Sequence, residues 1–204
     1  LIVIGYLFKK HGFPGDGFWG PAEKLTYYIL LPALIVRSIT ETDISTMPVG
    51  PMALVILSLG TIMIILALII KPFLRVDGPA YTSVLQGTAR INAYICFAIG
   101  DALYGTKSVA LCAYFLAVMM PFINMTLTPL ISAYAGTGRP NWSRVPIQVL
   151  QNPIIIGCAI GWTINTLTIQ LPNWVLRLLS ILEQGTLPIA LLCIGAGLVL
   201  TLDR

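Results

Sequence analysis

The sequence predicts an all-α integral membrane protein with several spans, and three observations lead to this fold class. Of its 204 residues, 57% are hydrophobic and only 10% are charged, whereas soluble domains have about 25% charged residues. The mean hydropathy is +0.88. Three runs contain no Asp, Glu, Lys or Arg, namely Ile44–Ile70, Ser108–Gly138 and Val145–Leu176. Because roughly 20 apolar residues cross a bilayer, each run is long enough for a span.

Seven apolar segments follow one another along the chain. Stretches such as HGFPGDGFWGP and AGTGRPNWSR separate them, since Gly and Pro end helices and Trp suits the headgroup level. The first segment is too short for a span, so we expect it to be the end of a longer helix and the chain to be a fragment. The segments are Leu1–Phe8, Ala22–Thr40, Pro48–Leu74, Gly87–Tyr104, Ser108–Ala133, Pro146–Gln170 and Trp174–Leu202.

The charges between these segments predict the orientation in the membrane. Basic residues gather at the odd junctions, whereas Glu41 and Asp43 follow the second segment, Asp101 and Lys107 lie at the fourth, and the sixth has no charge. By the positive-inside rule the odd junctions are cytoplasmic, which places the N-terminus on the other side. The basic residues are Lys9, Lys10 and Lys24, then Lys71, Arg75 and Arg90, then Arg139 and Arg144.

Two pairs of short stretches indicate an internal repeat. IGYLF at residues 4–8 resembles IGWTI at 160–164, and LLPALIV at 30–36 resembles TLPIALL at 186–192, with equal spacing within each pair. A chance match of common residues is the alternative. If the repeat is real, it contains five helices, and an odd number inverts the second copy. We then expect ten spans, with residues 1–135 as the first repeat and 145–204 as the start of the second.

Polar side chains within apolar segments are candidate site residues, because an unsatisfied polar group in hydrocarbon costs several kcal/mol. Arg37 either binds a ligand, reaches the interface, or pairs with Glu41 four residues later. Asn124 lies between two prolines that expose backbone carbonyls, and packing against a neighbouring helix is an equal interpretation. We interpret Glu183 and Arg177 as interfacial residues.

The stretch QGTARINAYICFAIGDALYG, residues 86–105, cannot form one continuous apolar helix. We expect a short span from Asn92 to Gly105 with its break at Gly100, and an aqueous loop around Gln86 and Arg90. Ends of broken helices direct partial charges at ligands near the bilayer midplane. Asn92 would orient such a ligand, since its amide both donates and accepts hydrogen bonds.

Four stretches together resemble the auxin efflux carrier family, and specifically its bacterial members related to malonate transporters. They are ARINAYICFAIGDALYG, LTYYILLPALIVRSI, QNPIIIGCAIGW and GTLPIALLCIGAGL. The resemblance implies two inverted five-helix repeats, fourth and ninth helices broken where they cross, and an organic-anion site at that crossing. Asn92 would begin the crossover. The stretch AYICFAIG departs from the family pattern, because no proline follows Asn92.

The predicted function is secondary active transport of small mono- or dicarboxylates across the bacterial inner membrane by alternating access. The candidate substrate-binding residues are Asn92, Arg90, Tyr94, Asn124 and Arg37. A channel-like, sensory or structural membrane domain is the alternative. We expect proton or sodium coupling, no cofactor, and no enzymatic activity, since no Walker, GxSxG or HExxH motif occurs. The expected partners are the anion, the bilayer and a second copy of the chain; dispersed basic residues argue against nucleic acid.

Overall fold

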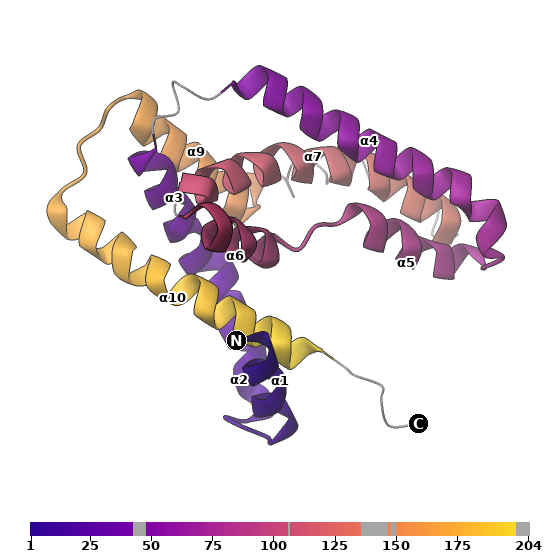
Figure 1. The fold of residues 1–204 in the computed structure, drawn as a ribbon, viewed down its shortest axis with the longest axis horizontal. Coiled ribbons are helices and arrows are strands. Elements are labelled where there is room, and N and C mark those ends of the chain that lie inside the picture. The colour runs from indigo at the N-terminus through magenta and orange to yellow at the C-terminus, as the bar shows by residue number, and fades with distance from the viewer. Residues whose placement is uncertain (43–47, 106, 136–146, 148–149, 199–204) are drawn as a thin grey trace.

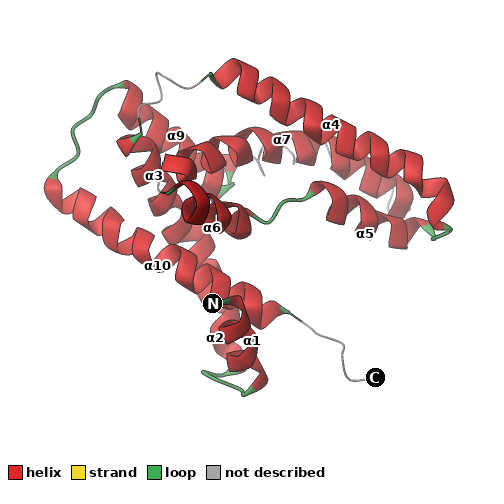
Figure 2. Ribbon diagram, viewed as in Figure 1, coloured by secondary structure: helices red, strands yellow, loops and turns green. Residues whose placement is uncertain are grey.

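Every regular element that the structure describes is a helix (Figures 1 and 2). The computed structural model describes residues 1–42, 48–105, 107–135, 147 and 150–198. The predicted all-α class is therefore confirmed. In chain order the elements are α1 (Ile2–Lys10), α2 (Asp16–Leu25), the π-helical turn η1 (Thr26–Leu30), α3 (Leu31–Glu41), α4 (Val49–Leu74), α5 (Gly78–Ala89), α6 (Ala93–Tyr104), α7 (Lys107–Ala135), α9 (Pro153–Thr166) and α10 (Asn173–Gly197).

Three of these helices are long and apolar enough to cross a membrane: α4, residues Ser108–Ile131 of α7, and α10. They are the elements of a multi-pass membrane protein. The expected sixth segment, Pro146–Gln170, is wrong as one continuous helix. The chain turns at Gln151 and Asn152, and α9 then has 14 residues, fewer than the roughly 20 that cross a bilayer.

The second helical run begins earlier than expected. Helix α2 starts at Asp16, inside the Gly-rich stretch, and α2, η1 and α3 follow one another without a loop. Gly15 has a φ of 130°, a conformation that glycine adopts readily, and it directs the chain into the helix. Asp16 then suits the positive end of the helix dipole, and its Oδ1 lies 2.5 Å from Lys9 Nζ.

The break in the 86–105 stretch lies before Asn92, and the expectation of a break at Gly100 is wrong. Gln86 belongs to α5 rather than to a loop, and the chain is extended from Arg90 to Asn92. Gly100 is helical and buried within α6, and a methyl group there would lie 2.8 Å from Cys112 Sγ. Gly100 therefore permits close approach of α6 to α7 and does not end a helix.

Two of the junctions used for orientation lie partly outside the described residues. Asp43 of the second junction, and Arg139, Arg144 and the neighbouring Gly138 of the fifth, belong to segments that the structure does not describe. The predicted orientation therefore stays a prediction.

Two apolar cores share α7. The first core combines α3, α6 and α9 with residues 109–116 of α7, and the second combines α4 and α5 with residues 114–127 of the same helix. Figure 1 shows α7 between α4 and the group formed by α3, α6 and α9. Phe97 of the first core and Tyr81 of the second are fully buried. Tyr81 also donates a hydrogen bond of 2.6 Å to the Ala67 carbonyl, which joins α5 to α4.

Glycines set the close contacts of two helix pairs, α1 with α10 and α3 with α9. A methyl group at Gly5 would clash with the carbonyl oxygen of Leu192, and one at Gly161 would lie 3.4 Å from the Val36 Cα. Gly161 follows Gly5 by the same number of positions as Leu192 follows Val36. The two helix pairs thus meet through corresponding residues.

Candidate functional site

A polar cavity of about 290 Å³ lies where the α5–α6 break meets α7 and the start of α9. Apolar side chains of α7 form one wall, and three polar side chains come from three different parts of the chain. The described lining residues are Arg90, Ile91, Leu116, Met119, Met120, Ile123, Asn124 and Asn152.

The side chain of Asn92 caps the start of α6, directly after the break between α5 and α6. Its Oδ1 accepts hydrogen bonds from the backbone N–H groups of Tyr94 at 3.0 Å and Ile95 at 3.2 Å. These are two of the N–H groups that the first turn of a helix leaves without an internal partner. The Asn92 amide nitrogen makes no hydrogen bond within the described part of the chain, so it remains able to donate.

Asn152 begins α9 in the same way that Asn92 begins α6. Its Oδ1 accepts a hydrogen bond of 2.9 Å from the Ile154 N–H, and its Nδ2 lies 3.0 Å from Met120 Sδ. The residue was not among the predicted site residues. The dipeptide Asn152–Pro153 could have indicated it, because asparagine is a preferred N-cap and proline a preferred first helical residue.

Asn124 reaches the cavity from α7, a helix that contains Pro121 and Pro129. Each proline lacks an N–H, so the carbonyl four residues earlier loses its helical partner. The Asn124 side chain is half-buried and has no hydrogen bond to any other described residue. It is therefore a polar group beside the cavity without a partner among the described residues.

The charge distribution of the cavity favours an anion. Arg90 carries a full positive charge and forms no ion pair with any residue that the structure describes, and none of the described lining residues is acidic. Helix α9 begins at the cavity with its cap Asn152, and α6 begins two positions after the lining residue Ile91, so the positive ends of two helix dipoles lie near this space. A guanidinium binds a carboxylate through two parallel hydrogen bonds, and the amides of Asn124 and Asn152 offer further donors.

The predicted site residues divide into two groups. Arg90 and Asn124 line the cavity, and Asn92 stands two positions from Arg90 at the start of α6. Tyr94 instead packs against the first apolar core, and its hydroxyl is buried without a hydrogen-bond partner in the described structure. Arg37 lies elsewhere too, on α3.

Arg37 forms two ion pairs. Its Nε donates to Glu41 Oε1 at 3.0 Å, and its Nη1 donates to Glu183 Oε2 at 2.7 Å. The pairing of Arg37 with Glu41 is confirmed. The contact with Glu183 joins α10 to α3, and the interfacial position expected for Glu183 and Arg177 stays a prediction.

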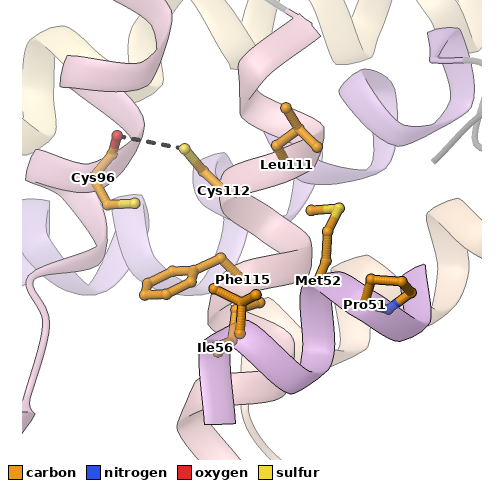
Figure 3. A pocket seen from close by; sticks show the side chains of 8 residues that line it. Pro51, Met52, Ile56, Cys96, Leu111, Cys112 and Phe115 are labelled. Atoms are coloured by element: carbon orange, nitrogen blue, oxygen red, sulfur yellow. Dashed lines mark hydrogen bonds between the residues drawn. The ribbon is translucent and has the colours of Figure 1, made fainter. Parts of the chain in front are cut away.

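A larger, apolar cavity of about 470 Å³ lies between α4, α6 and α7 (Figure 3). Met52 and Ile56 face it from α4, Cys96 from α6, and Phe115 from α7. Cys112 Sγ lies 3.6 Å from the Cys96 carbonyl oxygen, and the dashed line in Figure 3 marks this contact. No charged side chain lines this cavity among the described residues, so it lacks the groups that would orient an organic anion.

Comparison of the chain with family models, with curated proteins and with solved structures gives no match. The interpretation of the polar cavity therefore depends on the residues that line it.

Proposed function

We propose that this chain belongs to a secondary active transporter of small organic anions, and that the polar cavity is its anion site. The observation that carries the proposal is the Arg90 guanidinium, which has no ion-pair partner in the described chain and lines one cavity with the Asn124 and Asn152 amides. Anion binding would supply a counter-charge for Arg90 and a hydrogen-bond acceptor for the Asn124 amide.

The size and lining of the cavity suit a short mono- or dicarboxylate. Pockets for drug-sized ligands hold about 300–1,000 Å³, and this cavity of about 290 Å³ is at the lower limit. Arg90 would bind one carboxylate, and the Asn124 and Asn152 amides would donate to remaining oxygens. Met119 and Met120 would contact the methylene carbons between carboxylates.

The glycine contacts support the inverted repeat that underlies alternating access. Thr186 Oγ1 donates to the Leu30 carbonyl at 3.0 Å, and these residues are 156 positions apart, the offset that also relates Gly5 to Gly161. A contact between a residue and its own counterpart is expected on a two-fold axis. Repeats of 1–135 and 145–204, within ten spans in total, explain this arrangement.

The direction of the helices at this axis favours inversion over a parallel repeat. Leu30 contacts Thr186, whereas Arg37, later in the chain, contacts Glu183, which is earlier. Helices α3 and α10 therefore run in opposite senses where they meet. Counterpart helices of an inverted repeat do so, because its axis lies in the membrane plane.

The break at residues 90–92 fits a crossover helix. The resemblance to auxin efflux carriers implies a proline after Asn92, and here the Asn92 cap would interrupt the helix without one. We place the protein in the bacterial inner membrane, with the N-terminus on the non-cytoplasmic side and an ion gradient as the driving force.

Counterflow in proteoliposomes tests the proposal. Labelled malonate outside should exchange with unlabelled malonate inside, which a channel-like or sensory domain would not support. Hydrogen bonds to charged groups contribute about 1.5–3 kcal/mol, so Arg90→Gln should raise the KM of exchange roughly 10- to 150-fold.

Arg75→Gln is the matched control, because it removes the same charge at the end of α4, away from the cavity lining. Its KM should stay near that of the unmodified protein. Equal effects of Arg75→Gln and Arg90→Gln would show that Arg90 acts through surface charge, and uptake without exchange or saturation would refute a carrier.

A further inference from the structure

The apolar cavity of about 470 Å³ between α4, α6 and α7 has a lining that does not suit water. Its described lining consists of apolar side chains and two cysteines (Figure 3), and these side chains supply no nitrogen or oxygen atom. A buried water molecule needs two to four polar partners. The natural occupant of this space is therefore an apolar group.

Two contacts hold α4 against α7 on either side of the lining stretch of α4. The Tyr114 hydroxyl donates a hydrogen bond of 2.7 Å to the Val49 carbonyl. At Gly60, an added methyl group would lie 2.8 Å from a ring carbon of Phe122, so the two helices are in close contact there. The lining residues of α4, numbers 51–56, lie between these contacts. Atoms that border an unfilled space lose dispersion contacts, so an occupant that fits between the two contacts would stabilise the structure.

The cavity opens towards the outer surface of α4. Val55 and Leu111, which line it, are 57% and 39% exposed. The outer face of α4 beside this opening is also apolar and exposed, at Leu54, Leu59 and Ile62. Helix α4 is long and apolar enough to cross a membrane, where such a face contacts lipid hydrocarbon. The opening therefore continues a lipid-facing surface, and an acyl chain can enter it without passing through water.

The position of the cavity along the helices places it near one surface of the bilayer. Pro51 and Ile56 are the third and eighth residues of α4, so the cavity lies within about 10 Å of the start of a helix about 39 Å long. Phe115 is the ninth residue of α7. Because the hydrocarbon core is about 30 Å thick, the part of a lipid tail that follows the headgroup lies at this depth.

We propose that this cavity binds an acyl chain of a membrane phospholipid. The headgroup would stay at the bilayer surface near the start of α4, and the tail would pass Val55 and Leu111 into the cavity. There it would contact Ile56, Phe115 and the flexible Met52, a residue type that adapts to irregular apolar surfaces. The volume lies within the range of about 300–1,000 Å³ for ligand pockets. Lipid binding at this site does not depend on the proposed transport function.

The lining favours the tail of a phospholipid over a free fatty acid. A fatty acid would bring its carboxylate to the cavity, and among the described residues no basic side chain lines it. A phospholipid keeps its charged groups in the headgroup region, outside the cavity. The site therefore needs only an apolar lining and an opening to the bilayer, and the cavity has both.

Photocrosslinking of the full chain in nanodiscs that hold one chain each tests the proposal. The probe is phosphatidylglycerol with a diazirine in its acyl chain, and mass spectrometry locates the adducts. We expect adducts at Met52, Cys96 and Phe115 in excess over those at Ile69, on the exposed outer face of α4. Unlabelled phosphatidylglycerol should compete for these positions more effectively than unlabelled palmitate does.

Val55→Trp should block the opening and abolish the adducts at Cys96 and Phe115. Ile62→Trp is the matched control, because Ile62 is an exposed residue two turns later on the same helix and does not line the cavity. The adducts should remain in this control. If Val55→Trp fails to fold, Leu111→Trp narrows the opening from α7 and decides the question.

Three results would overturn the proposal. Adducts spread evenly over the outer face of α4, without excess at Cys96 and Phe115, would show ordinary lipid contact only. Adducts at Cys96 and Phe115 that persist in both Val55→Trp and Leu111→Trp would show that the tail does not enter by this opening. Absence of adducts in single-chain nanodiscs, with crosslinks between chains at these residues in crowded proteoliposomes, would assign the cavity to a second copy of the chain.

Discussion

Replacement of Asn92 separates a structural role from a binding role, because its two side-chain atoms do different things. The oxygen caps α6 through hydrogen bonds to the N–H groups of Tyr94 and Ile95, whereas the amide nitrogen has no partner in the described structure. Asn92→Asp keeps the capping oxygen but removes the donor and adds a negative charge. Asn92→Ala removes both.

The expected magnitudes follow from this division. Loss of an N-cap costs about 1 kcal/mol, so Asn92→Ala should shift the unfolding equilibrium about 5-fold towards the unfolded state. Asn92→Asp should unfold like the unmodified protein, since aspartate caps as well as asparagine does. Both substitutions should abolish malonate counterflow, Asn92→Ala by loss of the donor and Asn92→Asp also by repulsion of the anion.

Two assays on the same preparations measure these effects: denaturant unfolding in detergent, and counterflow in proteoliposomes. Asn92→Asp is the decisive variant, because its fold is preserved while its donor is lost. Counterflow of Asn92→Asp at the unmodified rate would refute contact between Asn92 and the anion, and would leave Asn92 with its capping role alone.

Three further predictions concern other parts of the chain. Asn152→Ala should cost about 1 kcal/mol of stability through its lost cap and raise the KM of counterflow; an unchanged KM would remove Asn152 from the site. Gly161→Ala should separate α9 from α3, since the added methyl would lie 2.9 Å from a side-chain carbon of α3, and should lower the free energy of unfolding by about 1–3 kcal/mol. The control Gly17→Ala, which meets open space in α2, should stabilise slightly; equal losses would contradict the packing argument. The hydrogen bond from Lys9 lowers the pKa of Asp16 below its ordinary value of 3.8. The stabilisation from this contact is therefore complete at neutral pH, and it is lost as the pH falls through the lowered pKa. Carboxyl NMR titration should show Lys9→Met returning this pKa to the ordinary value, and an unmoved pKa would contradict the contact.

Hydropathy alone predicted the helical class and the bounds of α4, because Pro48 and the charged residues after Leu74 limit an otherwise apolar run. Helix α5 escaped prediction, since polar residues hide its buried positions Tyr81, Leu85 and Ala89. Their spacing of four is a helical signal, and Asp77, which accepts from the Ala80 N–H, is a recognisable N-cap. Local signals for this helix were therefore present.

Other features depend on contacts between distant parts of the chain. Gly100 resembles a helix breaker in the sequence, and only its neighbour Cys112 on α7 shows that it serves close packing. Likewise, the pairing of Arg37 with Glu41 follows from a spacing of four, whereas its contact with Glu183, 146 positions away, requires the fold. Arg90 and Asn124 were identified separately, and their meeting in one cavity could not be read from spacing.

The division of α7 between two cores has a mechanical consequence. Leu116 belongs to the first core, whereas Tyr114 and Met119 belong to the second, so α7 contacts both cores along the stretch that walls the polar cavity. Pro121, which has no backbone N–H to donate to a helical hydrogen bond, lies directly beside this stretch. A movement of one core relative to the other would therefore act on this stretch of α7. Such a movement would change the volume available to a bound anion.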